Sequence, residues 1–144
     1  MLFSLNDTEP FLKRGLGPDY MPELKLKQLQ YECATWKRSL SFMIEENIRL
    51  KNRIAEILKD NFDTGLLERI ETFQNNFIDE DTRMSLLRDD VADLEKLLAY
   101  EPSEIKTRDA IDSKLKKIRN NIMEAEKQFS GLKLAFNNYL TKNM

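Results

Sequence analysis

The stretch LKQLQYECATWKRSL, residues 26–40, decides the fold. Its apolar side chains recur at alternating steps of three and four residues, and the same steps continue as far as Ile57. This spacing places one narrow apolar stripe along a helix, which is the pattern of coiled-coil packing. The stripe consists of Leu26, Leu29, Cys33, Trp36, Leu40, Met43, Asn47, Leu50, Ile54 and Ile57.

Two further stripes with the same steps follow along the chain. The second consists of Leu66, Ile70, Phe73, Phe77, Glu80, Met84, Leu87, Val91, Leu94 and Leu98. The third consists of Ile111, Leu115, Ile118, Ile122, Ala125, Phe129, Leu132, Phe136 and Tyr139. Together the three stripes predict long helices at about 22–60, 64–100 and 103–142. The short connections favour antiparallel neighbours, so we predict an all-α, antiparallel three-helix coiled-coil bundle.

Residues 1–21 differ in character from the rest of the chain. They contain Pro10, Gly15, Gly17 and Pro18, which interrupt helices, together with several large apolar side chains. The sequence therefore predicts an irregular N-terminal arm at 1–21 and a three-helix bundle at 22–144. A homodimer that shares part of the stripes is the alternative, but short loops favour local folding as a monomer.

Charge is distributed unevenly over the three expected helices. Residues 61–101 carry 11 Asp/Glu and 4 Lys/Arg, whereas residues 102–144 carry 9 Lys/Arg and 5 Asp/Glu. Residues 22–60 carry 8 Lys/Arg and 6 Asp/Glu. An acidic middle helix between two basic helices favours antiparallel pairing within one chain, although each exposed ion pair contributes only a few tenths of a kcal/mol.

The sequence lacks several of the features that enzymes commonly use for catalysis. The chain has no His, so the usual general base and the Ser-His and Cys-His pairs are absent. Its single Cys lies on the first stripe, and no Gly-rich phosphate loop or paired-Cys metal motif is present. We therefore expect no catalytic, metal or cofactor site, and no enzyme. With no long apolar segment and no basic leader, we expect a cytoplasmic protein without a membrane span.

Two polar residues, Asn47 and Glu80, interrupt the apolar stripes. If the loops fold near residues 62 and 101, both residues lie near the middle of the bundle, close to the small Ala125. The favoured interpretation is a buried polar layer that fixes the helix register at some cost in stability. A small ligand site at this layer and a Glu80 side chain turned towards solvent are the alternatives.

Several large apolar residues lie off the stripes. Scattered apolar residues are common on protein surfaces, but these are also candidates for a contact surface. We predict that Leu58, Phe62, Leu67, Leu134 and Leu140 close one end of the bundle. The candidate interaction surface for an unknown protein partner, or for self-association, consists of Phe11, Leu12 and Leu16 in the arm with Leu24, Tyr31, Phe42 and Ile48.

The third helix carries the densest basic patch, at Lys114, Lys116, Lys117 and Arg119. These residues spread around the helix, whereas phosphate binding needs aligned cations. Nucleic-acid contact through this helix is therefore the alternative function and protein–protein interaction the favoured one. The three-helix layout resembles a spectrin-type repeat, in architecture alone.

Overall fold

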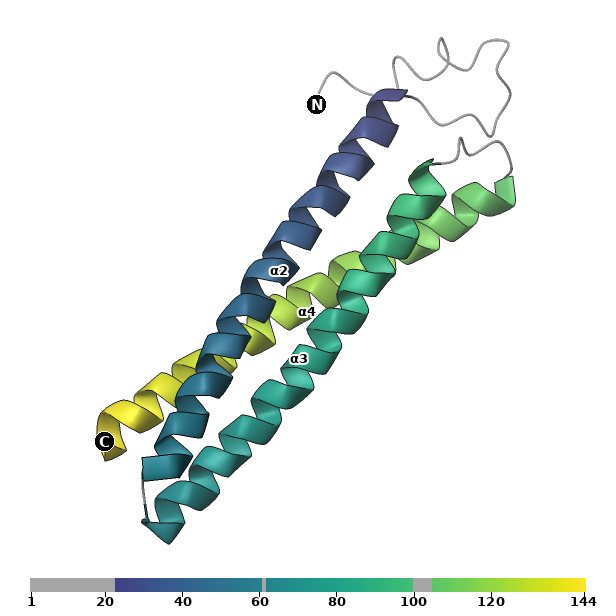
Figure 1. The fold of residues 1–144 in the computed structure, drawn as a ribbon. Helices are drawn as coiled ribbons and strands as arrows, with labels where there is room; N and C mark the ends of the chain where they lie inside the picture. Colours follow the sequence, from purple (N-terminus) through teal and green to yellow (C-terminus); the bar gives the residue numbers. More distant parts are fainter. Residues whose placement is uncertain (1–22, 61, 100–104) are drawn as a thin grey trace, which may run out of the picture.

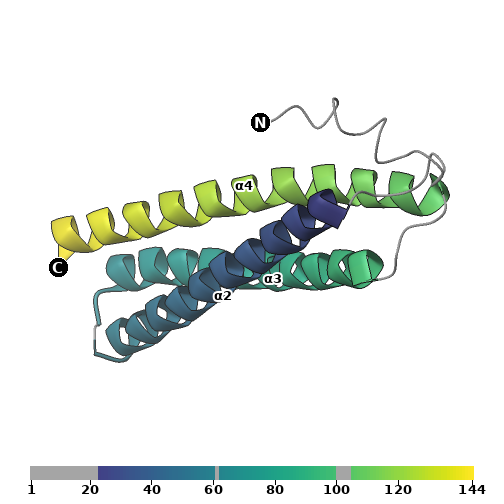
Figure 2. The same cartoon turned by 90° about the horizontal axis from the view of Figure 1, so that it is seen from above.

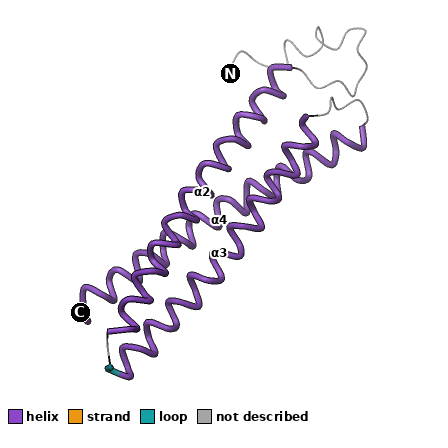
Figure 3. Tube along the Cα trace, in the orientation of Figure 1, coloured by secondary structure: helices purple, strands orange, loops and turns teal. Residues whose placement is uncertain are grey.

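The computed structural model describes residues 23–60, 62–99 and 105–144. Three helices follow one another along the chain: α2 (Glu23–Asp60), α3 (Thr64–Ala99) and α4 (Ile105–Asn143). They pack along one another as a bundle (Figure 1), and Figure 3 shows only helix and short loop in the described part. The predicted all-α three-helix bundle is confirmed. The predicted N-terminal arm lies outside the described residues.

The helices run up, down and up, so α2 and α4 are parallel to each other and α3 is antiparallel to both. The C-terminus accordingly lies at the same end of the bundle as the α2–α3 connection (Figure 1). Seen from above, α2 crosses in front of α3 at an angle (Figure 2). With 36 to 39 residues each, the helices are about 55 Å long at 1.5 Å per residue.

The start of α3 is set by a side-chain cap. The backbone N–H of Leu66 donates to Oδ1 of Asp63 at 3.0 Å, and the N–H of Leu67 donates to the Asp63 carbonyl at 2.9 Å. A capping carboxylate satisfies amide groups that lack a partner in the first helical turn. Asp63 is therefore the N-cap residue of α3.

The predicted stripes form the core. Most of their side chains are buried, whereas Leu26, Leu50, Leu66, Leu132 and Tyr139 are only partly buried and pack at its edge. Within the core, the ring centroids of Phe73 and Phe136 lie 5.2 Å apart, and those of Phe77 and Phe136 lie 5.5 Å apart. These edge-on aromatic contacts join α3 to α4.

The end of the third stripe differs from the heptad prediction. Leu140 is buried to 7% exposure, whereas the stripe residue Tyr139 is only partly buried. A straight helix drifts by about 20° per heptad relative to a 3.5-residue repeat. Over the four heptads after Ile111 this drift approaches the 100° step of one residue, so the residue after Tyr139 turns towards the core.

The predicted cluster at one end of the bundle is wrong in part. Phe62 is 91% exposed and Leu134 is also exposed, so neither helps to close the bundle. Leu140 is buried, Leu58 packs against the core, and Leu67 is half-buried. Phe62 lies in the short link between Asp60 and Thr64, where its side chain precedes the capped turn and does not pack against a helix.

Candidate functional site

The two polar residues of the stripes lie in the core. Asn47 on α2 is 0% exposed and Glu80 on α3 is 5% exposed. Asn47 reaches the backbone carbonyl of Phe77, which lies about one turn before Glu80 on α3, so the two polar residues lie close to the same level of the bundle. We call Asn47 and Glu80 the polar layer. The alternative of a Glu80 side chain exposed to solvent is not observed.

Each member of the polar layer has one satisfied and one unsatisfied side. Asn47 donates from Nδ2 to the Phe77 carbonyl at 2.9 Å, and Glu80 Oε2 accepts from Nη2 of Arg83 at 2.7 Å. The remaining oxygens, Asn47 Oδ1 and Glu80 Oε1, are buried and have no protein hydrogen-bond partner. An unpaired buried polar group costs about 1–3 kcal/mol, so these two oxygens lower the stability of the bundle.

Helix α4 completes the surroundings of the polar layer. Lys133 forms an ion pair at 3.0 Å with Glu46, the residue before Asn47. The Lys133 ammonium also lies 5.3 Å from the centroid of the Phe129 ring. Phe129 therefore lies at the level of the polar layer. The buried Ala125 lies one turn before Phe129 on α4. The sequence interpretation placed Ala125 beside the layer and did not identify Phe129.

Burial controls the ionisation of Glu80. Desolvation raises the pKa of this carboxyl above its ordinary value, and the nearby Asp79 raises it further, while the Arg83 guanidinium opposes both. Desolvation has the largest effect of the three. It raises the pKa because burial costs the carboxylate more hydration free energy than it costs the neutral acid. Protonation of the Glu80 carboxyl is therefore coupled to its burial in the polar layer.

The described residues offer little other chemistry. No group of three or more Cys, Asp or Glu side chains among them is arranged to hold a metal ion. The Cys33 thiol is fully buried, and burial with the carboxylates of Glu95 and Glu32 raises its pKa to about 11, against a smaller lowering by Lys37. A thiol in this environment is a poor nucleophile because very little thiolate forms at neutral pH.

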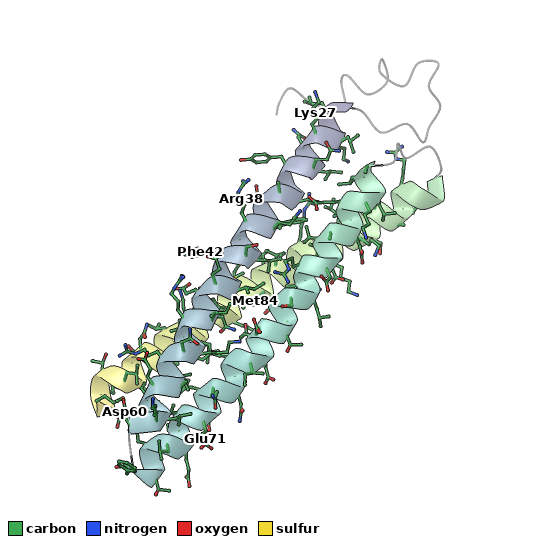
Figure 4. The ribbon with its side chains drawn as sticks, in the orientation of Figure 1. Lys27, Arg38, Phe42, Asp60, Glu71 and Met84 are labelled. Carbon is green, nitrogen blue, oxygen red and sulfur yellow. The ribbon has the colours of Figure 1, made fainter. Side chains whose placement is uncertain are left out.

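The predicted interaction surface divides into two parts. Leu24, Tyr31, Phe42 and Ile48 are all exposed on α2, with Tyr31 at 70% and Phe42 at 61%. Figure 4 shows Phe42 and Arg38 on the outer side of α2, away from α3. The structure therefore places Leu24, Tyr31 and Phe42 on one outer face of α2, whereas Ile48 lies about 120° around the helix from Phe42. Phe11, Leu12 and Leu16 lie outside the described residues.

The basic patch of α4 is partly used within the molecule. Arg119 donates from Nε and Nη2 to the two carboxylate oxygens of Glu32 on α2, at 2.9 and 2.8 Å. This bidentate hydrogen bond also raises the pKa of Arg119. Lys114, Lys116 and Lys117 remain exposed, and no ion pair joins them to other described residues.

The ion pairs between helices are features that the stripes alone did not identify. Three polar contacts join α2 to α4 with the same sequence separation of 87 residues: Glu32–Arg119, Ser39–Glu126 and Glu46–Lys133. They recur every seven residues on positions that flank the apolar stripe of each helix. The charges at these flanking positions, taken helix by helix, are the signal that could have predicted them.

Comparison with known proteins adds no further constraint, since no protein family, curated protein or solved structure matches this chain. Within the described residues, none of the three helices has an apolar stretch long enough to cross a membrane.

Proposed function

We propose that this chain is a non-enzymatic helical-bundle protein that acts through protein–protein interaction. The observation that carries the proposal is the outer face of α2, where Tyr31 and Phe42 are mostly exposed while the heptad stripe of the same helix fills the core. Aromatic side chains that remain exposed after the core is complete are enriched at protein interfaces. A cytoplasmic location fits the single buried thiol.

The geometry gives the alternative function less support. Nucleic-acid contact through α4 depends on several aligned cations, and the most C-terminal cation of the basic patch, Arg119, is held by Glu32 on both carboxylate oxygens. Only the exposed Lys114, Lys116 and Lys117 of this patch would then be available to bind phosphate, without help from Arg119. A binding constant for a random DNA duplex at low salt tests this alternative, and strong binding that falls steeply with salt would favour it over the main proposal.

The native mass of the endogenous protein tests the proposed function. In a gentle lysate we expect a species heavier than the purified chain, because the partner stays bound. The double variant Tyr31→Ser/Phe42→Ser should return the lysate species to the mass of the purified chain. The matched control is Met123→Ser/Leu134→Ser, which removes two exposed apolar side chains from α4. A lysate mass equal to that of the purified chain would contradict a stable partner.

A further inference from the structure

The three grooves between the helices differ in whether ion pairs join the two helices that form them. The α2–α3 groove is bridged by Lys37–Glu95 at 3.0 Å and by Lys51–Asp81 at 3.2 Å. The α2–α4 groove is bridged by Arg119–Glu32 at 2.8 Å and by Lys133–Glu46 at 3.0 Å. Between α3 (Thr64–Ala99) and residues 109–143 of α4, no ion pair joins the two helices.

The unbridged groove is hollowed and has an apolar side chain at its rim. Its volume is about 370 Å³, and Leu87 at its base is buried while the adjacent Leu86 is 60% exposed. The side chains that line it are Arg83, Leu86, Leu87 and Asp90 from α3 and Asn121, Glu124 and Gln128 from α4. This α3–α4 groove therefore offers a partner both apolar surface and polar groups from two helices.

The charge of the α3–α4 groove is negative. Asp90 and Glu124 contribute one carboxylate from each helix, and neither has an ion-pair partner among the described residues. The only cation that lines the groove, Arg83, is bound to Glu80 at 2.7 Å. Around the groove α3 is acidic as a whole, with 9 Asp/Glu against 4 Lys/Arg in Thr64–Ala99.

We propose that the α3–α4 groove binds a basic amphipathic helix of a partner protein, which contacts Leu86 with an apolar side chain and pairs its cations with Asp90 and Glu124. Helix-in-groove docking uses apolar residues at helical spacing, and opposite charges fix orientation and favour encounter. Lys117 lies one turn before Asn121 on α4, so the negative charge of the groove ends at Asn121 on this helix. This inference rests on the proposed function and adds to the outer face of α2 a second surface, the α3–α4 groove, together with the class of partner that fits it.

A model peptide tests the chemistry of the α3–α4 groove. The probe is a fluorescent amphipathic helix of Leu and Lys, with a Leu and Glu helix as its counterpart, and fluorescence anisotropy measures binding to the full chain. We expect the double variant Asp90→Asn/Glu124→Gln to weaken Leu/Lys peptide binding about tenfold. The Leu/Glu peptide should bind neither protein.

The matched control separates a specific groove from general attraction. The variant Glu71→Gln/Asp89→Asn also removes two exposed carboxylates of α3, which lie about 100° around the helix from Asp90 on its outer face, and should change binding by less than about twofold. Equal weakening by both double variants would overturn the proposal, because the peptide would then respond only to net charge. Circular dichroism checks that each variant keeps its helices.

Photo-crosslinking in cells that make the protein tests the partner itself. A photoreactive residue replaces Leu86 in one variant and Phe42 in another, and mass spectrometry identifies the crosslinked segment. An adduct at position 86 to a Lys/Arg-rich amphipathic segment of another protein supports the groove. An adduct at position 86 to a second copy of this chain, or to a segment without basic residues, contradicts it. An adduct at position 42 alone leaves the proposed function standing without the groove, and none at either position contradicts both.

Discussion

Asn47 on α2 donates its side-chain N–H to the backbone carbonyl of Phe77 on α3, at 2.9 Å and wholly within the core. This bond ties a side chain of α2 to the backbone of α3, so separating or rotating the two helices at this level would leave the buried Asn47 amide without its acceptor. A single polar residue in a coiled-coil stripe commonly selects one register and one assembly at a cost in stability. The bond therefore gives a physical reason for a polar residue in this position.

The first prediction concerns Asn47→Leu. The substitution removes a buried amide with one unsatisfied oxygen and adds apolar surface, so we expect the free energy of unfolding to rise by about 1–2 kcal/mol. We also expect less specific assembly, seen as additional oligomers or broadened NMR signals. Urea unfolding and native mass spectrometry measure both effects. The control Asn52→Leu makes the same change at an exposed position and should alter neither; a destabilised Asn47→Leu protein would contradict the register role.

The second prediction concerns the pH dependence that Glu80 confers. Its folded pKa is raised above the ordinary value of 4.5, so the folded state holds the proton more tightly than the unfolded state. Stability from this group is fully present below pH 4.5 and is lost as the pH rises through the folded pKa. We expect Glu80→Gln, which stays neutral, to remove this fall. Urea unfolding between pH 4 and 8 measures it.

The control for the Glu80 prediction is Glu71→Gln. Glu71 is exposed on the same helix, so its variant should keep the pH profile of the parent protein. The ¹³C chemical shift of the Glu80 carboxyl gives the pKa directly. A Glu80 titration at or below 4.5 would show that the Arg83 ion pair outweighs burial, and the pH dependence would then have another source.

Much of the fold follows from periodicity alone. The heptad steps give the three helices and most of the core, because side chains at alternating steps of three and four share one helix face. The misses have physical causes. Leu140 replaces Tyr139 because a small drift per heptad accumulates along α4. Phe62 is exposed because no helix positions a side chain in the short link before Asp63.

The site was less predictable than the fold. The sequence marks Asn47 and Glu80 as polar residues in apolar stripes, but it does not indicate that Asn47 bonds to a backbone carbonyl or that Glu80 pairs with Arg83. Those bonds depend on rotamers and on the crossing of the helices, which periodicity does not contain. The α3–α4 groove likewise differs from the other two grooves in its lack of ion pairs between α3 and residues 109–143 of α4, and this difference depends on side-chain positions that periodicity does not contain.

The third prediction concerns the bidentate pair of Arg119 and Glu32. Its side chains are partly exposed, so a double-mutant cycle with Arg119→Gln and Glu32→Gln should give a coupling free energy of about 0.5–1 kcal/mol. Arg119→Lys should lose much of it, because an ammonium cannot form the two parallel hydrogen bonds. The singly bonded Lys133–Glu46 pair is the comparison. Zero coupling at low salt would indicate that the pair does not hold α2 against α4.

The fourth prediction concerns the Cys33 thiol. With full burial and a pKa of about 11, the folded protein should resist alkylation at pH 7.5. Iodoacetamide should therefore label Cys33 only as fast as the chain opens, and the labelling rate should rise with urea. The control variant Cys33→Ala/Ser130→Cys carries its thiol at an exposed position and should react at the rate of a free thiol. Equally fast labelling of the two proteins would show that the start of α2 separates readily from the bundle.

The fifth prediction concerns Gly131, which lies inside α4. A Cβ at this position meets no atom within 4 Å, so Ala fits without any shift of its neighbours. Because Gly has more backbone freedom in the unfolded chain, Gly131→Ala should raise the free energy of unfolding by about 0.5–1 kcal/mol. The neighbouring exposed Ser130→Ala should give a smaller gain, because Ser is a better helix former than Gly. Thermal and urea unfolding of both variants measure the difference, and a Gly131→Ala protein less stable than its parent would mean that α4 is not a regular helix at this point.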